Sequence, residues 1–160
     1  MTLFVLQVVS LFFTGLLAGA ELVMRYGIRG PLASLDQRPH ILLRQALVRR
    51  LRILIPGILV PSVVSGIAVA VLGRAMVGAE FRWAAVLALA TFLTVTLGGT
   101  VPINKSVQAW QPDAPPADWL EIVHRWERLN TVRCWALVTA FACLLTALAM
   151  QLPRLDVSGS

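Results

Sequence analysis

Four long apolar segments alternate along the chain with polar stretches, and each apolar segment is long enough to cross a membrane. A helix rises about 1.5 Å per residue, so about 20 apolar residues span the roughly 30 Å hydrocarbon core of a bilayer. The hydrophobic pattern therefore predicts an all-α fold, an integral membrane four-helix bundle. The four predicted spans are roughly residues 2–24, 53–72, 83–103 and 133–151.

The composition excludes an ordinary soluble domain. Of the 160 residues, 58% are hydrophobic and 14% are charged, and the mean hydropathy is +0.77, whereas soluble domains have about half apolar and about a quarter charged residues. A soluble chain of 17.4 kDa cannot bury so much apolar surface, so the lipid bilayer is the predicted partner of most of it. The length indicates one membrane domain, residues 1–160.

The net charge of +6 does not require a nucleic-acid partner, because the cations gather in two of the segments between spans. Cytoplasmic loops of membrane proteins carry an excess of Lys and Arg. Residues 25–52 and 104–132 are therefore predicted to be cytoplasmic loops, with both termini outside, and the Arg- and Ala-rich style of the sequence favours a bacterial inner membrane. The cations of these loops are Arg25, Arg29, Arg38, Arg44, Arg49, Arg50, Arg52, Lys105, Arg125 and Arg128, against Arg74, Arg82 and Arg154 on the other side.

The second of these loops is predicted to contain an additional cytoplasmic helix that precedes the fourth span. The run WLEIVHRWERLNTVR follows a proline-rich turn and begins after Asp118, a residue type that caps helix starts. Helical spacing places a row of its side chains on one face, namely Trp119, Val123, Trp126, Asn130 and Arg133.

Several polar side chains map to the predicted cytoplasmic third of the bundle and form the candidate site. Strongly polar groups at membrane depth are costly, so each is a functional candidate by default. These side chains come from different parts of the sequence, yet they converge at one level. The predicted catalytic residues are Glu21, Asn104 and Arg133, and the predicted substrate-binding residues are Arg44, Gln45, Trp126 and Asn130.

Each predicted catalytic residue also has a purely structural interpretation. Glu21 lies four residues before Arg25, a spacing at which a helix allows an ion pair. Asn104 belongs to a residue type that is common at helix ends, and Pro102 interrupts regular hydrogen bonding nearby. Arg133 either extends to the membrane interface, pairs with Glu21, or binds an anionic or phenolate oxygen.

The two histidines, His40 and His124, both fall in the predicted cytoplasmic loops. Two imidazoles and a carboxylate suit iron or copper, so Glu21, His40 and His124 are the candidate metal ligands. Nothing in the spacing brings the histidines together, and surface histidines are common, so a protein without a cofactor is the alternative.

Several stretches of the sequence resemble the anthrone oxygenase-like family of small four-helix membrane proteins, which is largely of unknown function. They are GLLAGAELV, LLRQALVRRLRILIPGILVPS, TVPINKSVQAW, WLEIVHRWERLNTVR and AFACLLTAL. These stretches are spread along the sequence, so the resemblance covers nearly the whole chain. The most specific pieces are Pro102 with Asn104, and the run that contains Arg125, Trp126 and Arg133.

The resemblance implies a function for some of these residues. Named members of the family are oxygenases of aromatic polyketide pathways that convert anthrones to anthraquinones without an evident organic cofactor. By this resemblance Asn104 is a functional polar group, placed beside a pocket by a helix end at Pro102. The family often has a histidine where this chain has Asn130, so a role of that histidine as base or ligand would be missing here.

Two functions fit the sequence. The first is a membrane-embedded enzyme that acts on a lipophilic or aromatic small molecule in a biosynthetic pathway. In this hypothesis Glu21 abstracts a proton, Arg133 and Asn104 stabilise the oxyanion, and the carbanion reacts with O₂, with metal assistance as a variant. The second is a non-enzymatic membrane protein for small-molecule binding, assembly or transport, in which the small-residue run around Gly15 mediates helix contacts within the chain or in a homo-oligomer.

Overall fold

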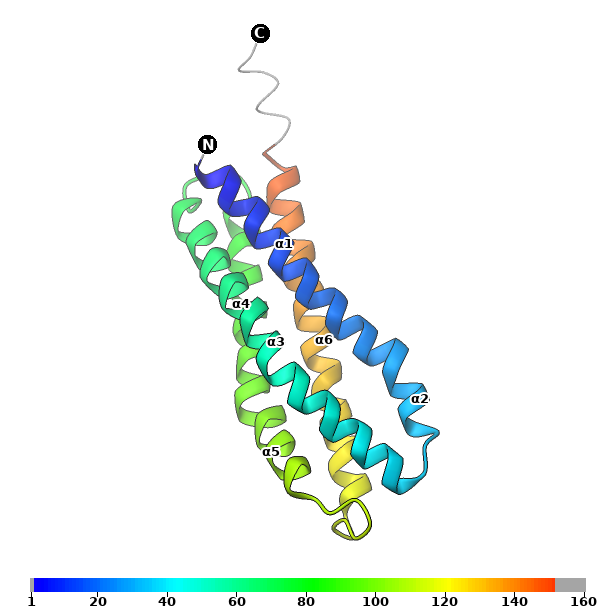
Figure 1. Cartoon of the computed structure of the whole chain (residues 1–160). Coiled ribbons are helices and arrows are strands. Elements are labelled where there is room, and N and C mark those ends of the chain that lie inside the picture. Colours follow the sequence, from blue (N-terminus) through cyan, green and yellow to red (C-terminus); the bar gives the residue numbers. More distant parts are fainter. Residues whose placement is uncertain (1, 152–160) are drawn as a thin grey trace.

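The computed structural model describes residues 2–151 and consists of four long helical rods (Figure 1). Two rods are single helices and two are built of consecutive pieces that change pitch. No β-strand occurs among the described residues, which confirms the predicted all-helical bundle. The first rod is α1 (Thr2–Leu22), η1 (Val23–Ile28) and α2 (Arg29–Ala33), the second is α3 (Gln37–Leu72), the third is α4 (Ala79–Val95), η2 (Thr96–Thr100) and α5 (Val101–Ala109), and the fourth is α6 (Trp119–Ala149).

The rods form an up-and-down bundle in which neighbours in sequence are neighbours in space. α1 packs against α3 and α6, and α4 packs against α6 and α3. The beginning of α1 and the end of α6 lie at one end of the bundle, and α2 and the end of α5 lie at the other (Figure 1). Small residues allow close packing between rods, because a Cβ atom at Gly15 would lie 2.9 Å from the Phe141 ring of α6.

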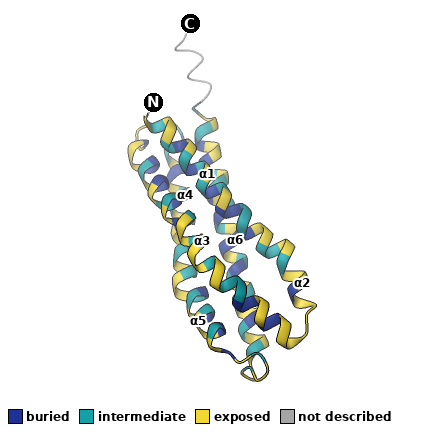
Figure 2. Cartoon of the chain, in the orientation of Figure 1, coloured by how far each residue is buried: buried dark blue, intermediate teal, exposed yellow. Residues whose placement is uncertain are grey.

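The outer surface of the bundle is apolar, as expected of a protein in lipid. Figure 2 shows exposed residues along all the long helices. Among them are large hydrophobic side chains such as Phe12, Val60 and Leu87, each more than half exposed. All four rods are long and apolar enough to cross a membrane. The chain is therefore an integral membrane protein by the length and composition of its helices.

The helices are longer than the predicted spans. α3 has 36 residues and is about 54 Å long, whereas the hydrocarbon core of a bilayer is about 30 Å thick. Most of the segment 25–52, predicted as a loop, is helical. The structure has no separate helix before the fourth span either, because residues 119–132 are the first part of α6 and continue into the span without a break.

The sequence suggested that the third helix ends at Pro102, but the third rod continues beyond this residue to Ala109. A π-helical turn, η2, contains Gly98 and Gly99 and shifts the pitch just before Pro102, which then takes a position in the first turn of α5. A proline is tolerated there because its missing N–H has no essential partner. The hydroxyl of Thr100 donates to the carbonyl of Thr96 at 3.1 Å, so a side chain supplements the backbone bonds where the pitch changes.

Two apolar clusters fill the interior, and they are separated along the bundle axis. The first lies in the middle of the bundle and includes Leu17, Phe92 and Leu137. The second lies near the α2–α5 end and includes Ile41 and Val107. Along α3 and α6, the residues between these clusters line a cavity.

Candidate active site

The cavity has a volume of about 670 Å³ and is walled by all four rods. Its size falls in the range of small-molecule sites, about 300–1,000 Å³. One wall is formed by α3, which contributes mainly apolar side chains together with Arg44 and Arg52, and the other rods contribute further polar side chains. The apolar side chains of α3 include Leu47, Val48, Leu51 and Ile55, and the polar side chains of the other rods include Glu21, Thr100, Asn104, Asn130 and Arg133.

A buried ion pair lies at the inner end of the cavity. The Glu21 Oε1 atom of α1 accepts a hydrogen bond from Arg133 Nη2 of α6 at 2.5 Å, and both residues are buried. The i,i+4 pair of Glu21 with Arg25 does not form, because Arg25 donates instead to the Thr131 hydroxyl. The second carboxylate oxygen, Glu21 Oε2, is buried and has no hydrogen-bond partner among the described residues.

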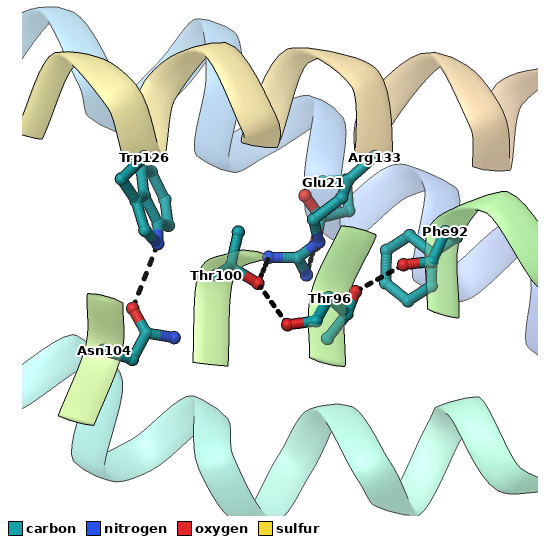
Figure 3. A network of polar contacts seen from close by, with 7 residues as sticks. All are labelled: Glu21, Phe92, Thr96, Thr100, Asn104, Trp126 and Arg133. Atoms are coloured by element: carbon teal, nitrogen blue, oxygen red, sulfur yellow. Dashed lines mark hydrogen bonds and ion pairs between the residues drawn. The ribbon is translucent and has the colours of Figure 1, made fainter. Parts of the chain in front are cut away.

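Arg133 is held on three sides (Figure 3). Besides Glu21, its Nη1 atom donates to the hydroxyl of Thr100 at 3.3 Å, and its guanidinium carbon lies 4.8 Å from the centre of the Phe92 ring. Gly99 lets η2 approach α6 closely, because a Cβ atom there would lie 2.8 Å from Leu129. The π-helical turn therefore brings Thr100 within reach of Arg133, and such turns are frequent at functional sites.

Asn104 lies one turn beyond Thr100 and is inside α5, so it does not cap a helix end. Its Oδ1 atom accepts a hydrogen bond from the Trp126 indole N–H at 3.0 Å. Figure 3 shows its amide nitrogen pointing away from Trp126, and this nitrogen donates to no other described residue. The amide therefore keeps a free donor beside the cavity.

Arg44 of α3 lies over the face of the Trp126 ring, whereas Asn104 binds the indole N–H. Its guanidinium carbon is 4.8 Å from the ring centre, and the residue is 5% exposed. A cation–π contact contributes about 0.5–2 kcal/mol, which is less than the several kcal/mol that burying a charge costs. Trp126 alone does not offset the burial of Arg44.

The structure brings six of the seven residues predicted for catalysis and substrate binding to the cavity, all except Gln45. The Gln45 amide nitrogen points to the third rod and donates to the carbonyls of Val107 at 2.9 Å and Trp110 at 3.0 Å. Both carbonyls lie at the end of α5, where helix carbonyls run out of partners within the helix, and the Val107 carbonyl also accepts the Trp110 N–H at 3.3 Å. Gln45 thus binds the end of α5 and does not line the cavity, unlike the other residues predicted to bind substrate.

The predicted metal ligands are not brought together. His40 is buried against the Trp119 ring, with ring centres 5.4 Å apart, and His124 is exposed on α6. Neither histidine lines the cavity that contains Glu21. Among residues 2–151, no group of three or more His, Cys, Asp or Glu side chains is close enough to hold a metal ion.

Several residues of the site were missed by the sequence analysis. Thr100 contacts Arg133, and a second ion pair joins Arg29 to Glu127 at 2.7 Å on the cavity wall. The signal for Thr100 was present in the sequence, because Thr96, Thr100 and Asn104 recur every four residues and so share one helical face. No comparable pattern pairs Arg29 with Glu127, since these residues belong to different rods.

The comparison with known protein families confirms the resemblance that the sequence indicated. The model of the anthrone oxygenase family matches residues 45–143, which include Asn104, Trp126, Asn130 and Arg133 but not Glu21 or Arg44. No curated protein and no solved structure matches the chain. The family name suggests an oxygenase-like function at the level of the family. Since the match covers more than half of its length, the chain belongs to the anthrone oxygenase family.

Proposed function

We propose that this protein is a membrane-embedded oxygenase that removes a proton from a lipophilic aromatic substrate and lets the resulting carbanion react with O₂. One observation carries the proposal. Glu21 is a buried carboxylate at the end of a cavity, with one oxygen fixed by Arg133 and the other without a partner. A general base needs a positioned oxygen that can reach the proton it takes.

Besides orienting Glu21, the ion pair keeps the charge of the site balanced during the proposed proton transfer. When Glu21 takes a proton, the negative charge moves from its carboxylate to the substrate, and Arg133 remains as the cation between the two. Arg133 then pairs with the new oxyanion, so no charge is left unbalanced in a site of low dielectric. Asn104 lies one turn beyond Thr100, the residue that binds Arg133, and its free amide donor adds a neutral donor to the oxyanion.

The proposed reaction balances without a further co-reactant. Glu21 takes one C–H proton from a methylene that is flanked by aromatic rings, and the carbanion transfers an electron to O₂ and combines with it through a new C–O bond. Protonated Glu21 returns the proton to give a hydroperoxide. Loss of the second C–H proton then breaks the O–O bond and releases water. One methylene and one O₂ become one carbonyl and one H₂O.

O₂ consumption in lipid nanodiscs tests this proposal. We expect the protein to oxidise anthrone to anthraquinone faster than empty nanodiscs, with one ¹⁸O atom from ¹⁸O₂ in each product molecule. Oxidation at the rate of empty nanodiscs, together with binding of anthrone, would contradict the enzyme and favour the alternative of a small-molecule-binding protein.

We also propose that the cavity end of the bundle faces the cytoplasm of a bacterial inner membrane. Support comes from the cations, which are concentrated near this end and are scarce in the turn 73–78 at the other end. The cavity then opens toward the cytoplasmic membrane interface.

Labelling of single exposed positions tests the orientation. With a membrane-impermeant maleimide added to intact spheroplasts, we expect Ala75→Cys in the turn 73–78 to be labelled and Ser34→Cys beside α2 to be protected. The parent chain is the control, because Cys134 is buried and Cys143 is partly buried against the central apolar cluster. Labelling of Ser34→Cys with protection of Ala75→Cys would reverse the assignment.

A further inference from the structure

We infer that the substrate carries an anionic group, a carboxylate, which binds Arg44 at the end of the cavity away from Glu21. This inference names the substrate class of the site and rests on the proposed function. It begins from the surroundings of Arg44. The residue is 5% exposed, lines the cavity, and its buried Nε atom has no hydrogen-bond partner among the described residues.

Both acidic side chains that line the cavity already form ion pairs with other arginines. Glu21 is paired with Arg133, and Glu127 is paired with Arg29 at 2.7 Å. No described acidic side chain lies within ion-pair distance of Arg44. Glu127 attracts it from farther away but is bound to Arg29, and the guanidinium of Arg44 itself rests on the neutral ring of Trp126. A guanidinium that is buried this far without a direct counter-ion is suited to bind one.

The cavity contains further cations but no further acid. Lys105 and Arg52 also line it, in addition to the arginines already paired. The cavity wall therefore has a surplus of positive charge, which attracts an anion and disfavours a cationic or zwitterionic ligand.

The position of Arg44 relative to the ion pair sets the shape of the ligand. Trp126, beneath Arg44, and Arg133, bound to Glu21, are seven residues apart on α6, a distance of about 10 Å along the helix axis. The wall between them includes the apolar side chains of Val48 and Leu51. The cavity thus fits an elongated aromatic body with a carboxylate at one end and the reacting carbon at the other.

Equilibrium binding of a fluorescent probe tests the inference. The probe is anthracene-2-carboxylate, and its uncharged counterpart is anthracene-2-carboxamide, both measured in phosphatidylcholine nanodiscs. We expect the wild-type protein to bind the carboxylate at least about tenfold more tightly, as a charged hydrogen bond to a buried guanidinium provides. We expect Arg44→Gln to reduce this preference to about one, and Arg44→Lys to keep part of it.

The matched control is Arg49→Gln, which removes an exposed cation of α3 outside the cavity. The wild-type preference should persist in this variant. Equal binding of the two probes by the wild type, failure to bind either, or an equal loss of preference in Arg49→Gln would overturn the inference.

Phospholipid headgroups are a second source of anions, so a further arm contains phosphatidylglycerol. Displacement of the probe by this lipid in the wild type but not in Arg44→Gln would assign Arg44 to a lipid phosphate and overturn the substrate assignment. The probe has no acidic methylene and is not oxidised by the proposed reaction. An Arg44-dependent preference for the carboxylate probe, together with anthrone oxidation no faster than in empty nanodiscs, would therefore contradict the proposed reaction alone.

Discussion

Replacing Glu21 by glutamine is expected to slow the O₂-dependent oxidation of anthrone by about 10²–10⁴-fold, the contribution of a positioned general base. Glutamine has nearly the shape of glutamate, but it cannot take a proton, so the first step of the proposed reaction loses its acceptor. The measurement is the initial rate of O₂ uptake, with ordinary anthrone and with anthrone deuterated at its methylene carbon. In the wild type, the deuterated substrate should react more slowly because C–H cleavage limits the rate.

Two further variants separate loss of chemistry from loss of structure. Glu80→Gln removes an exposed carboxylate at the start of α4, at the far end of the bundle, and should keep the wild-type rate. Glu21→Asp keeps a carboxylate but withdraws it by one methylene, so its rate should fall between those of the wild type and Glu21→Gln. A Glu21→Gln protein that is folded and still oxidises anthrone at the wild-type rate would rule out Glu21 as the base.

The four spans and the level of the site were predictable because both follow from one-dimensional patterns. The length of an apolar segment identifies a membrane span. The position of a polar residue near the end of a span gives its depth along the bundle axis. Glu21 and Arg133 could thus be placed near one another although 112 positions separate them in the chain. Periodicity on α6 also placed Trp126, Asn130 and Arg133 on one face, and all three line the cavity.

The remaining details depend on contacts between rods, which no local pattern encodes. Pro102 signals a helix end in isolation, but the preceding π-helical turn and its threonine hydroxyls allow the helix to continue. Gln45 lies next to Arg44 and at the same level, yet the rotation of 100° per residue turns it toward the end of α5 and out of the cavity. The depth of a residue along the bundle axis therefore does not distinguish a residue that lines the cavity from one that caps a helix.

Replacing Arg133 by methionine is expected to lower the free energy of unfolding by about 3–5 kcal/mol, the usual effect of removing one partner of a buried ion pair. Methionine fills much of the volume, but Glu21 is left as a buried charge, and Thr100 loses the donor that binds its hydroxyl. The measurement is reversible unfolding in detergent micelles, with unfolding of α6 followed by tryptophan fluorescence.

The second ion pair of the cavity provides the matched control. Arg29 and Glu127 also join the first rod to α6, but the Arg29 side chain is 48% exposed, so Arg29→Met should cost no more than about 1 kcal/mol. The double variant Glu21→Gln/Arg133→Met removes both buried charges, and we expect it to regain most of the stability that Arg133→Met loses. If the double variant is as unstable as Arg133→Met, the loss comes from packing around Arg133 and not from an unpaired Glu21. The roughly 3–5 kcal/mol expected for an unpaired buried charge would then not apply to Glu21 in this site.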